Sequence, residues 1–170
     1  MQPSCQPKTR APICTSTTQM AWQLFLQCGA TTMWESWEDA SCNSARSRDH
    51  AFMGTVDDWL FSGVAGIQGT SPAFRTVSID PSPVGDLTSA SGYERTPLGR
   101  VSSHWTRFGT SFALTIQVPV GSQASVCVPA ASAKSVTESG HPMGKASGVT
   151  VNGMQGSCLQ LHVGSGRVAS

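Results

Sequence analysis

The sequence has 170 residues, of which 39% are hydrophobic, and its formal net charge at pH 7 is +1. This size allows one packed domain or two small ones, and the near-neutral charge argues against nucleic acid or an anionic membrane as a partner. No run approaches the roughly 18 apolar residues of a membrane span, and the N-terminus lacks the apolar segment of a signal peptide. We leave the location open, with the cytoplasm as the default.

The six cysteines form neither a CxxC pair nor a Cys/His spacing typical of metal sites, so we expect no metal and no other cofactor. A disulfide framework is an alternative. However, the chain is long and cysteine-poor for a disulfide scaffold, and we therefore favour free thiols. The cysteines are Cys5, Cys14, Cys28, Cys42, Cys127 and Cys158.

The first part of the chain shows one weak and one strong helical signal. Residues 1–20 show little periodicity, whereas residues 21–27 (AWQLFLQ) favour the end of a helix that Gly29 stops. Residues 50–67 carry the clearest helical pattern, and Asp49 is placed to cap its first turn. The apolar face of this helix consists of Phe52, Val56, Trp59, Leu60, Gly63, Val64 and Ile67.

From residue 70 onward, apolar and polar residues alternate in short runs that Gly, Pro and Ser interrupt. Such runs predict short strands, each with one buried and one wet face, in an antiparallel sandwich or barrel. The runs are FRTVSID (74–80), RVSSHWTR (100–107), SFALTIQV (111–118), ASVCVP (124–129) and CLQLHVG (158–164). The sequence therefore predicts an α+β fold, in which one or two helices precede an all-β antiparallel sandwich. Because a lone amphipathic helix normally needs a larger helical partner, we expect helical sequence upstream to be missing.

The segment 29–37 (GATTMWESW) is the first candidate for chemistry. Glu35 is flanked by Trp34 and followed by Trp37. Aromatic rings stack on the apolar faces of sugars, and a carboxylate activates water or binds hydroxyls, so a sugar site is one interpretation of this pattern, although these residues alone are a weak signal for it. In the alternative interpretation, the tryptophans are core residues and the charged run around them is a solvated surface.

His50, at the start of the predicted helix, is the second candidate, either as a ligand for a sugar hydroxyl or as a structural residue. Common catalytic and phosphate-binding patterns such as GxSxG, HExxH and GxxxxGK[ST] are absent from the sequence. The remaining histidines, His104, His141 and His162, lie in the β half, away from any acidic cluster, and we expect them at the surface.

Several blocks, in this order, resemble the bacterial and fungal α-L-rhamnosidases, which are inverting glycoside hydrolases with an (α/α)6 catalytic barrel. The resemblance covers about residues 28–168. The blocks are GATTMWESW (29–37), RDHAFMGTVDDWLFSGVAGI (48–67), FRTVSIDPSPVGDLTSA (74–90), TPLGRVSSHWTR (96–107), VTESGHPMGKASGVTV (136–151) and LQLHVGSGR (159–167).

This resemblance implies roles for the candidate residues. Glu35 aligns with the general base of the family, and His50 aligns with a histidine of the rhamnose pocket. Trp34 and Trp37 align with tryptophans around that pocket. Where the family usually has Asn before the histidine, this chain has Asp49. Nothing in residues 1–28 resembles the block that carries the general acid.

The resemblance divides the chain into residues 1–27 outside the match, 28–69 as a barrel remnant, and 70–170 as a C-terminal β-sandwich domain. We expect the C-terminal fragment of an enzyme that removes terminal α-L-rhamnose from glycosides, inactive without its N-terminal barrel. Alternatively, the β half is a non-catalytic module that binds carbohydrate or braces the barrel. Bracing is favoured because only Tyr93 and Trp105 suit a sugar platform. In a third alternative, a separate N-terminal fragment completes the enzyme.

Overall fold

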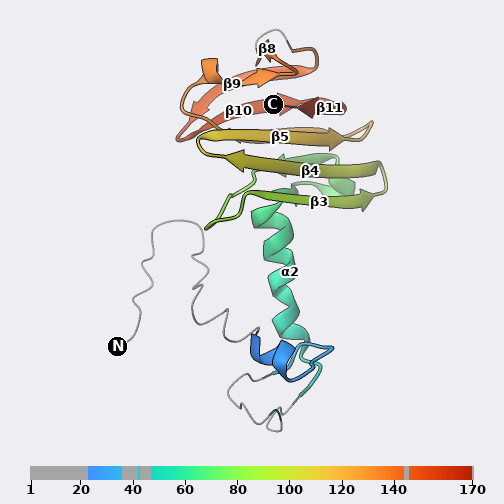
Figure 1. Ribbon diagram of the computed structural model, residues 1–170. Helices are drawn as coiled ribbons and strands as arrows, with labels where there is room; N and C mark the ends of the chain where they lie inside the picture. The colour runs from blue at the N-terminus through green and yellow to red at the C-terminus, as the bar shows by residue number, and fades with distance from the viewer. Residues whose placement is uncertain (1–22, 36–41, 43–46, 144–145, 170) are drawn as a thin grey trace. The chain divides into compact units, whose positions relative to one another are not determined.

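The computed structural model of the chain describes residues 23–35, 42, 47–143 and 146–169 (Figure 1). Two compact units are present, Met1–Val56 and Asp57–Ser170, and each is described by itself below. The larger unit contains the β-sandwich, which confirms the predicted α+β fold. Within the described residues, no helix has the length and apolar character needed to cross a membrane.

The first predicted helix end is present. Residues 23–27 are helical, and the chain then turns at Gly29, whose φ is +66°. The amide of Ala30 donates to the carbonyl of Phe25 over 2.9 Å, which closes the end of this helix. Glycine is suited to this position because a left-handed backbone is costly for residues with a Cβ atom.

The second helical stretch changes its winding along its length. It consists of the 3-10 helix η1 (Ala51–Gly54), the α-helix α2 (Thr55–Trp59) and the π-helix η2 (Leu60–Val64). The helix prediction for 50–67 is confirmed, with two corrections. His50 is the N-cap and makes no side-chain capping bond, so the cap expected from Asp49 is wrong. The stretch also ends before Ile67, because Gly66 turns the chain with φ +77° and Ile67 begins a strand.

The sandwich consists of a five-stranded sheet in the order β1-β2-β6-β10-β9, a four-stranded sheet in the order β11-β5-β4-β3, and a small β7-β8 pair. All neighbours are antiparallel except β2 and β6, which are parallel, so the expectation of a wholly antiparallel sandwich needs this correction. The strands are β1 (Ile67–Gly69), β2 (Thr76–Ile79), β3 (Ser89–Thr96), β4 (Gly99–Phe108), β5 (Ser111–Val118), β6 (Gln123–Pro129), β7 (Thr137–Glu138), β8 (His141–Pro142), β9 (Val149–Gln155), β10 (Cys158–Val163) and β11 (Gly166–Ala169).

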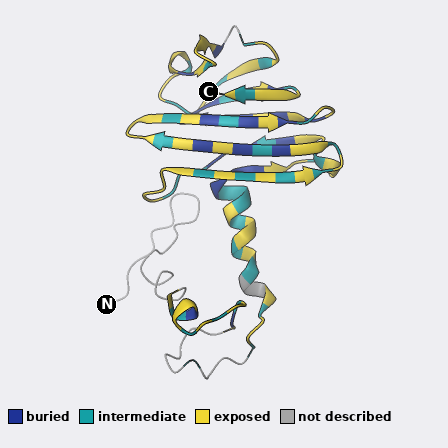
Figure 2. Cartoon of the chain, turned by 45° about the vertical axis from the view of Figure 1, so that its right-hand side comes forward, coloured by how far each residue is buried: buried dark blue, intermediate teal, exposed yellow. Residues whose placement is uncertain are grey.

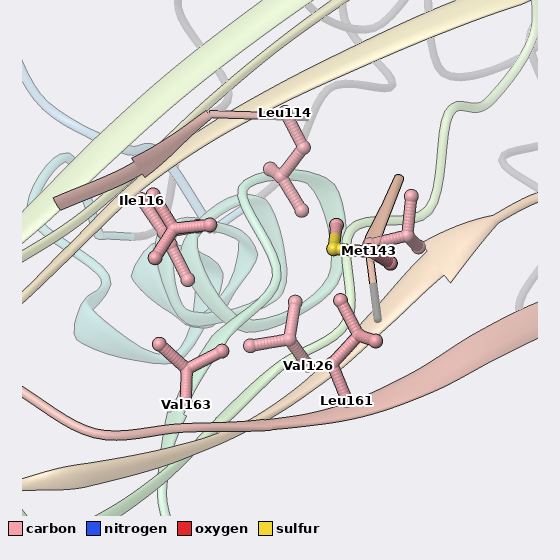
Figure 3. A pocket seen from close by; sticks show the side chains of 8 residues that line it. Leu114, Ile116, Val126, Met143, Leu161 and Val163 are labelled. Atoms are coloured by element: carbon pink, nitrogen blue, oxygen red, sulfur yellow. The ribbon is translucent and has the colours of Figure 1, made fainter. Parts of the chain in front are cut away.

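The core lies between the two larger sheets, and buried and exposed residues alternate along their strands (Figure 2). In β4, for example, Val101, Ser103 and Trp105 are buried while His104 and Thr106 are exposed. A small apolar cavity of about 10 Å³ remains between the sheets, lined by residues such as Leu114 and Leu161 (Figure 3). Such a volume is comparable to a single water molecule and far too small for a sugar.

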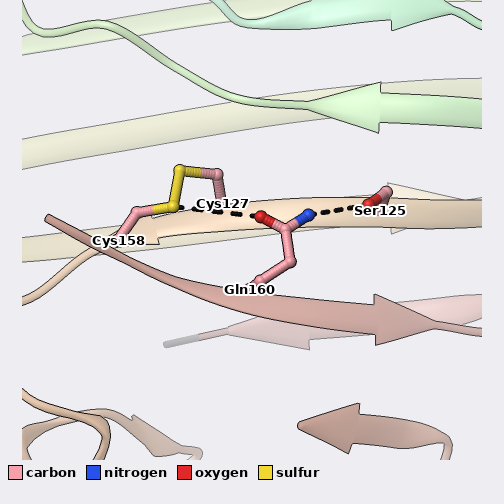
Figure 4. The surroundings of a disulfide bond; sticks show 4 residues. All are labelled: Ser125, Cys127, Cys158 and Gln160. Carbon is pink, nitrogen blue, oxygen red and sulfur yellow. Dashed lines mark hydrogen bonds between the residues drawn. A yellow bond between two sulfur atoms is a disulfide. The ribbon is translucent and has the colours of Figure 1, made fainter. Parts of the chain in front are cut away.

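A disulfide joins Cys127 of β6 to Cys158 of β10, with a Cα–Cα distance of 5.5 Å (Figure 4). Beside it, the amide of Gln160 donates to the hydroxyl of Ser125 over 2.7 Å. Cys28 and Cys42 form a second disulfide. The expectation of free thiols is therefore wrong for these four cysteines, because the fold brings together thiols that are far apart in the sequence. Cys5 and Cys14 lie outside the described residues.

The end of η2 is embedded in the sandwich. The indole N–H of Trp105, which is 0% exposed, donates to the carbonyl of Val64 over 2.8 Å. Two amides from the segment after β2 continue this junction, since Asp80 donates to Gly66 over 2.9 Å and Ser82 donates to Gly63 over 3.0 Å. These bonds satisfy carbonyls that a helix leaves without partners at its C-terminal end.

The junction also leaves little room for side chains at two glycines. A Cβ atom on Gly66 would lie 2.3 Å from the backbone nitrogen of Pro81, and one on Gly92 of β3 would lie 2.8 Å from the Cβ of Ala65. Both glycines therefore allow backbones to approach more closely than any larger residue would. The chain from Val64 to Ile67 is buried between these contacts.

We predict that Gly66→Ala lowers the free energy of unfolding by about 3–5 kcal/mol, because strain at positive φ adds to a clash with backbone. Gly85→Ala is the matched control, since Gly85 also has a positive φ, of +57°, but open space around its Cβ position. It should cost only about 1–2 kcal/mol. Urea unfolding followed by tryptophan fluorescence measures both, and equal losses would show that the junction is not tightly packed.

Candidate functional site

The smaller unit brings the two candidate segments side by side. The amide of Glu35 donates to the carbonyl of Ser47 over 2.9 Å, and the amide of His50 donates to the carbonyl of Met33 over 2.7 Å. The hydroxyl of Thr32 also donates to the carbonyl of Arg48. These three hydrogen bonds thus pair residues 32–35 with residues 47–50, and Glu35 and His50 lie on adjacent segments.

The side chains of these two candidates differ in exposure. Glu35 is exposed, and His50 is partly buried at the N-cap of η1. An exposed carboxylate can accept a proton from water or a hydrogen bond from a sugar hydroxyl, and an imidazole can donate or accept a hydrogen bond. Among the described residues, no three His, Cys, Asp or Glu side chains gather as they would around a metal ion.

Trp34 lies in the small core of this unit and is 7% exposed. The ring of Phe25 is tilted by 53° against its indole, with the centroids 5.9 Å apart, and the guanidinium carbon of Arg48 lies 5.0 Å from the indole centroid. In this structure Trp34 is therefore a buried residue between Phe25 and Arg48, and its expected contact with a sugar stays a prediction. Trp37 lies outside the described residues.

The disulfide between Cys28 and Cys42 spans the segment that carries Trp34 and Glu35, with a Cα–Cα distance of 5.5 Å. Arg48 reinforces this closure, because its guanidinium donates to the carbonyl of Cys42 over 3.2 Å. Neither contact was expected from the sequence. The sequence feature that could have indicated the disulfide is the position of Cys28 and Cys42 on either side of the segment WESW (34–37).

The larger unit offers fewer candidates for a neutral sugar site. Trp105 is fully buried, and its N–H is already bonded, so it cannot stack on a ligand. Tyr93 remains 50% exposed. His104, His141 and His162 are exposed, as predicted.

Two family models match the chain in sequence. One, described as the bacterial alpha-L-rhamnosidase 6 hairpin glycosidase domain, matches residues 6–64. The other, described as the bacterial alpha-L-rhamnosidase C-terminal domain, matches residues 66–142. The first match begins at residue 6, whereas the resemblance described from the sequence begins at about residue 28. The two matches meet where η2 ends in the sandwich.

Individual alpha-L-rhamnosidases are also similar to this chain. An alpha-L-rhamnosidase of Streptomyces avermitilis is 33% identical over 116 residues, which are 65% of this chain and 11% of that protein. The structure of alpha-L-rhamnosidase from Dictyoglumus thermophilum matches with a TM-score of 0.73 and 30% identity, over 85% of this chain and 16% of the other.

A second similar solved structure is that of Streptomyces avermitilis alpha-L-rhamnosidase complexed with L-rhamnose, with a TM-score of 0.72 and 29% identity. The match covers 88% of this chain and 14% of that structure. The chain thus spans between 11% and 16% of the length of these relatives. By both sequence and structure, the chain belongs to the bacterial α-L-rhamnosidase family and corresponds to a C-terminal part of these proteins.

Proposed function

We propose that this chain supplies the general-base side of the active site and the bracing β-domain of an α-L-rhamnosidase. The complete enzyme removes terminal, non-reducing α-L-rhamnose from rhamnosides with inversion. The observation that carries the proposal is the pairing of residues 32–35 with 47–50, which sets Glu35 beside the His50 segment. The family membership supports the choice of rhamnose as the sugar.

In an inverting glycosidase, one carboxylate activates water while a carboxylic acid protonates the leaving oxygen, and the two groups stand roughly 6.5–9.5 Å apart. We assign the first role to Glu35, whose exposed side chain can take a proton from water as the water attacks the anomeric carbon. His50 binds a sugar hydroxyl, and Trp34 and Trp37 belong to the pocket wall. We place the general acid in the larger protein, upstream of this chain.

The β-domain braces the end of the helical stretch. Its buried Trp105 holds the end of η2 through the carbonyl of Val64, and the continuous helical stretch begins directly after His50. Because the end of the helical stretch at Val64 is held in place, the movement of this stretch, which follows His50 in the sequence, is restricted. The burial of Trp105 also favours bracing over the alternative that the β-domain is a platform for neutral sugars.

We expect the isolated 170-residue chain to show no more than trace hydrolysis of an aryl α-L-rhamnoside. Losing a general acid lowers the rate by about 10²–10⁴-fold, and the loss of substrate positioning adds to this. The purified chain would be assayed against 4-nitrophenyl α-L-rhamnoside. Robust turnover that Glu35→Gln abolishes would contradict the placement of the acid outside this chain.

The role of Glu35 is tested in a chimera in which residues 28–170 replace the matching segment of the Streptomyces avermitilis enzyme. We expect Glu35→Gln to lower kcat by about 10²–10⁴-fold with little change in KM, because the base acts in the transition state. Asp86→Asn removes an exposed carboxylate from the β-domain as a control and should stay within twofold of the parent chimera. A Glu35→Gln chimera with kcat close to the control would exclude Glu35 as the base.

We also expect the disulfide between Cys28 and Cys42 to hold the Glu35 segment in place. Replacing both cysteines by Ser should make this segment more susceptible to limited proteolysis, because the open chain gains conformational entropy. The matched control replaces Cys127 and Cys158, which join β6 to β10 in the other unit. If both double variants were cleaved equally in residues 28–50, the disulfide would have no local role there.

A further inference from the structure

The outer face of the β11-β5-β4-β3 sheet carries a cationic surface that was not expected from the sequence. The strand register places Tyr93 opposite Ser102, Ser102 opposite Gln117, and Gln117 opposite Arg167. One row of side chains therefore crosses all four strands. In the next row, Arg95 of β3 stands directly opposite Arg100 of β4. We call this surface, formed by Tyr93, Arg95, Arg100, His104 and Arg167 with the hydroxyls between them, the cationic face.

The charges of the cationic face are unbalanced. In these four fully described strands, the outward-facing positions carry three arginines and no carboxylate, since Glu94 pairs with buried Val101 on the inner face. Within the described residues, none of the three arginines makes an ion pair. Like charges directly opposite each other destabilise a sheet, so the Arg95–Arg100 pair favours the binding of an anion that would offset the repulsion.

One of the arginines is held in position. The guanidinium carbon of Arg100 lies 4.1 Å from the centroid of the Tyr93 ring, a cation–π contact that restricts both side chains. Both residues are exposed, Tyr93 by 50%. A planar guanidinium fixed on an aromatic ring is preorganised for pairing with a carboxylate, because less side-chain entropy is lost on binding.

We propose that the cationic face binds an acidic polysaccharide whose carboxylates pair with the arginines. Arg95 and Arg167 lie on the two edge strands of a face three strand spacings wide, which is about 14 Å, and Arg100 lies on the strand next to Arg95. Duplex DNA carries a charge about every 1.7 Å and is bound by denser clusters, so this sparse pattern fits spaced uronates better. Ser91, Ser102, Thr115 and Gln117 on the same face offer partners for sugar hydroxyls.

The other outer face of the sandwich provides an internal contrast. The exposed polar residues on β6 and β10 include Gln123, Ser125 and His162, and Gln160 is bonded to Ser125. The outward positions of these two strands carry no arginine, lysine or carboxylate. The proposal goes beyond the bracing role and does not rest on Glu35 chemistry, because the cationic face lies entirely on the sandwich.

The experiment titrates the full 170-residue chain with polygalacturonate at low salt and measures binding by calorimetry or affinity electrophoresis. Dextran, a neutral polymer, is the control. We expect saturable binding of polygalacturonate that weakens steeply with added salt, and no binding of dextran. Arg95→Gln, Arg100→Gln and Arg167→Gln should each weaken binding by about two- to fivefold, and the triple variant by at least about tenfold. Lys134→Gln removes an exposed positive charge elsewhere and should change affinity little.

Arg95→Glu gives an independent readout. It replaces a repulsive cross-strand pair by an attractive one with Arg100, so the free chain should gain thermal stability while polygalacturonate binding is lost. Three results would overturn the proposal: no binding of polygalacturonate, equal weakening by Lys134→Gln, or tighter binding of duplex DNA than of polygalacturonate at the same salt. A stable Arg95→Glu chain that still binds as the parent does would overturn it as well.

Discussion

The hydrogen bond from the Trp105 indole to the Val64 carbonyl is the contact on which the organisation of the larger unit depends. A helix leaves its last carbonyls without partners, and a helix end buried among apolar side chains must find donors there. The sandwich supplies them from Trp105 in the core and from the amides of Asp80 and Ser82. Gly66 and Gly92 let the backbones approach closely enough for these bonds to form.

This junction explains why the boundary between the two family matches is structurally tight although it separates a helical from a β region. The matches end at residue 64 and begin again at residue 66, and Val64, Ala65 and Ile67 are all buried in the sandwich core. A loosely linked module would normally join through an exposed linker. A β-domain that encloses the last turn of a helix is suited to holding that helix, which is the basis of the bracing role proposed for it.

The sequence predicts the strands in which buried and exposed residue types alternate, as in Leu114, Ile116 and Val118 of β5, because burial on one face leaves that pattern in the sequence. The strand β3, SASGYERT, was not predicted from its periodicity, since its inner positions are small or polar and Gly92 replaces a side chain with space for Ala65. The parallel β2–β6 pair and both disulfides depend on contacts between distant segments, which local patterns do not reveal.

The sequence also predicts only part of the candidate site, because local patterns do not reveal contacts between distant residues. Glu35 and His50 were singled out from short motifs, and the structure sets their segments side by side, but no local pattern indicated that Arg48 would cover Trp34. Likewise, Trp105 and Tyr93 were equivalent candidates in the sequence. Only the register shows that one lies in the core while the other faces outward beside Arg100.

The central claim, that the sandwich holds the helix end, is tested most directly by hydrogen–deuterium exchange on the full chain carrying Trp105→Phe. Removing the indole N–H leaves a buried carbonyl unpaired, which costs about 1–3 kcal/mol locally. Amides of residues 60–66 should then exchange about 5- to 150-fold faster, the factor that this cost gives, while β10 is little changed. Unchanged exchange in residues 60–66, or the same acceleration in every strand, would contradict the claim.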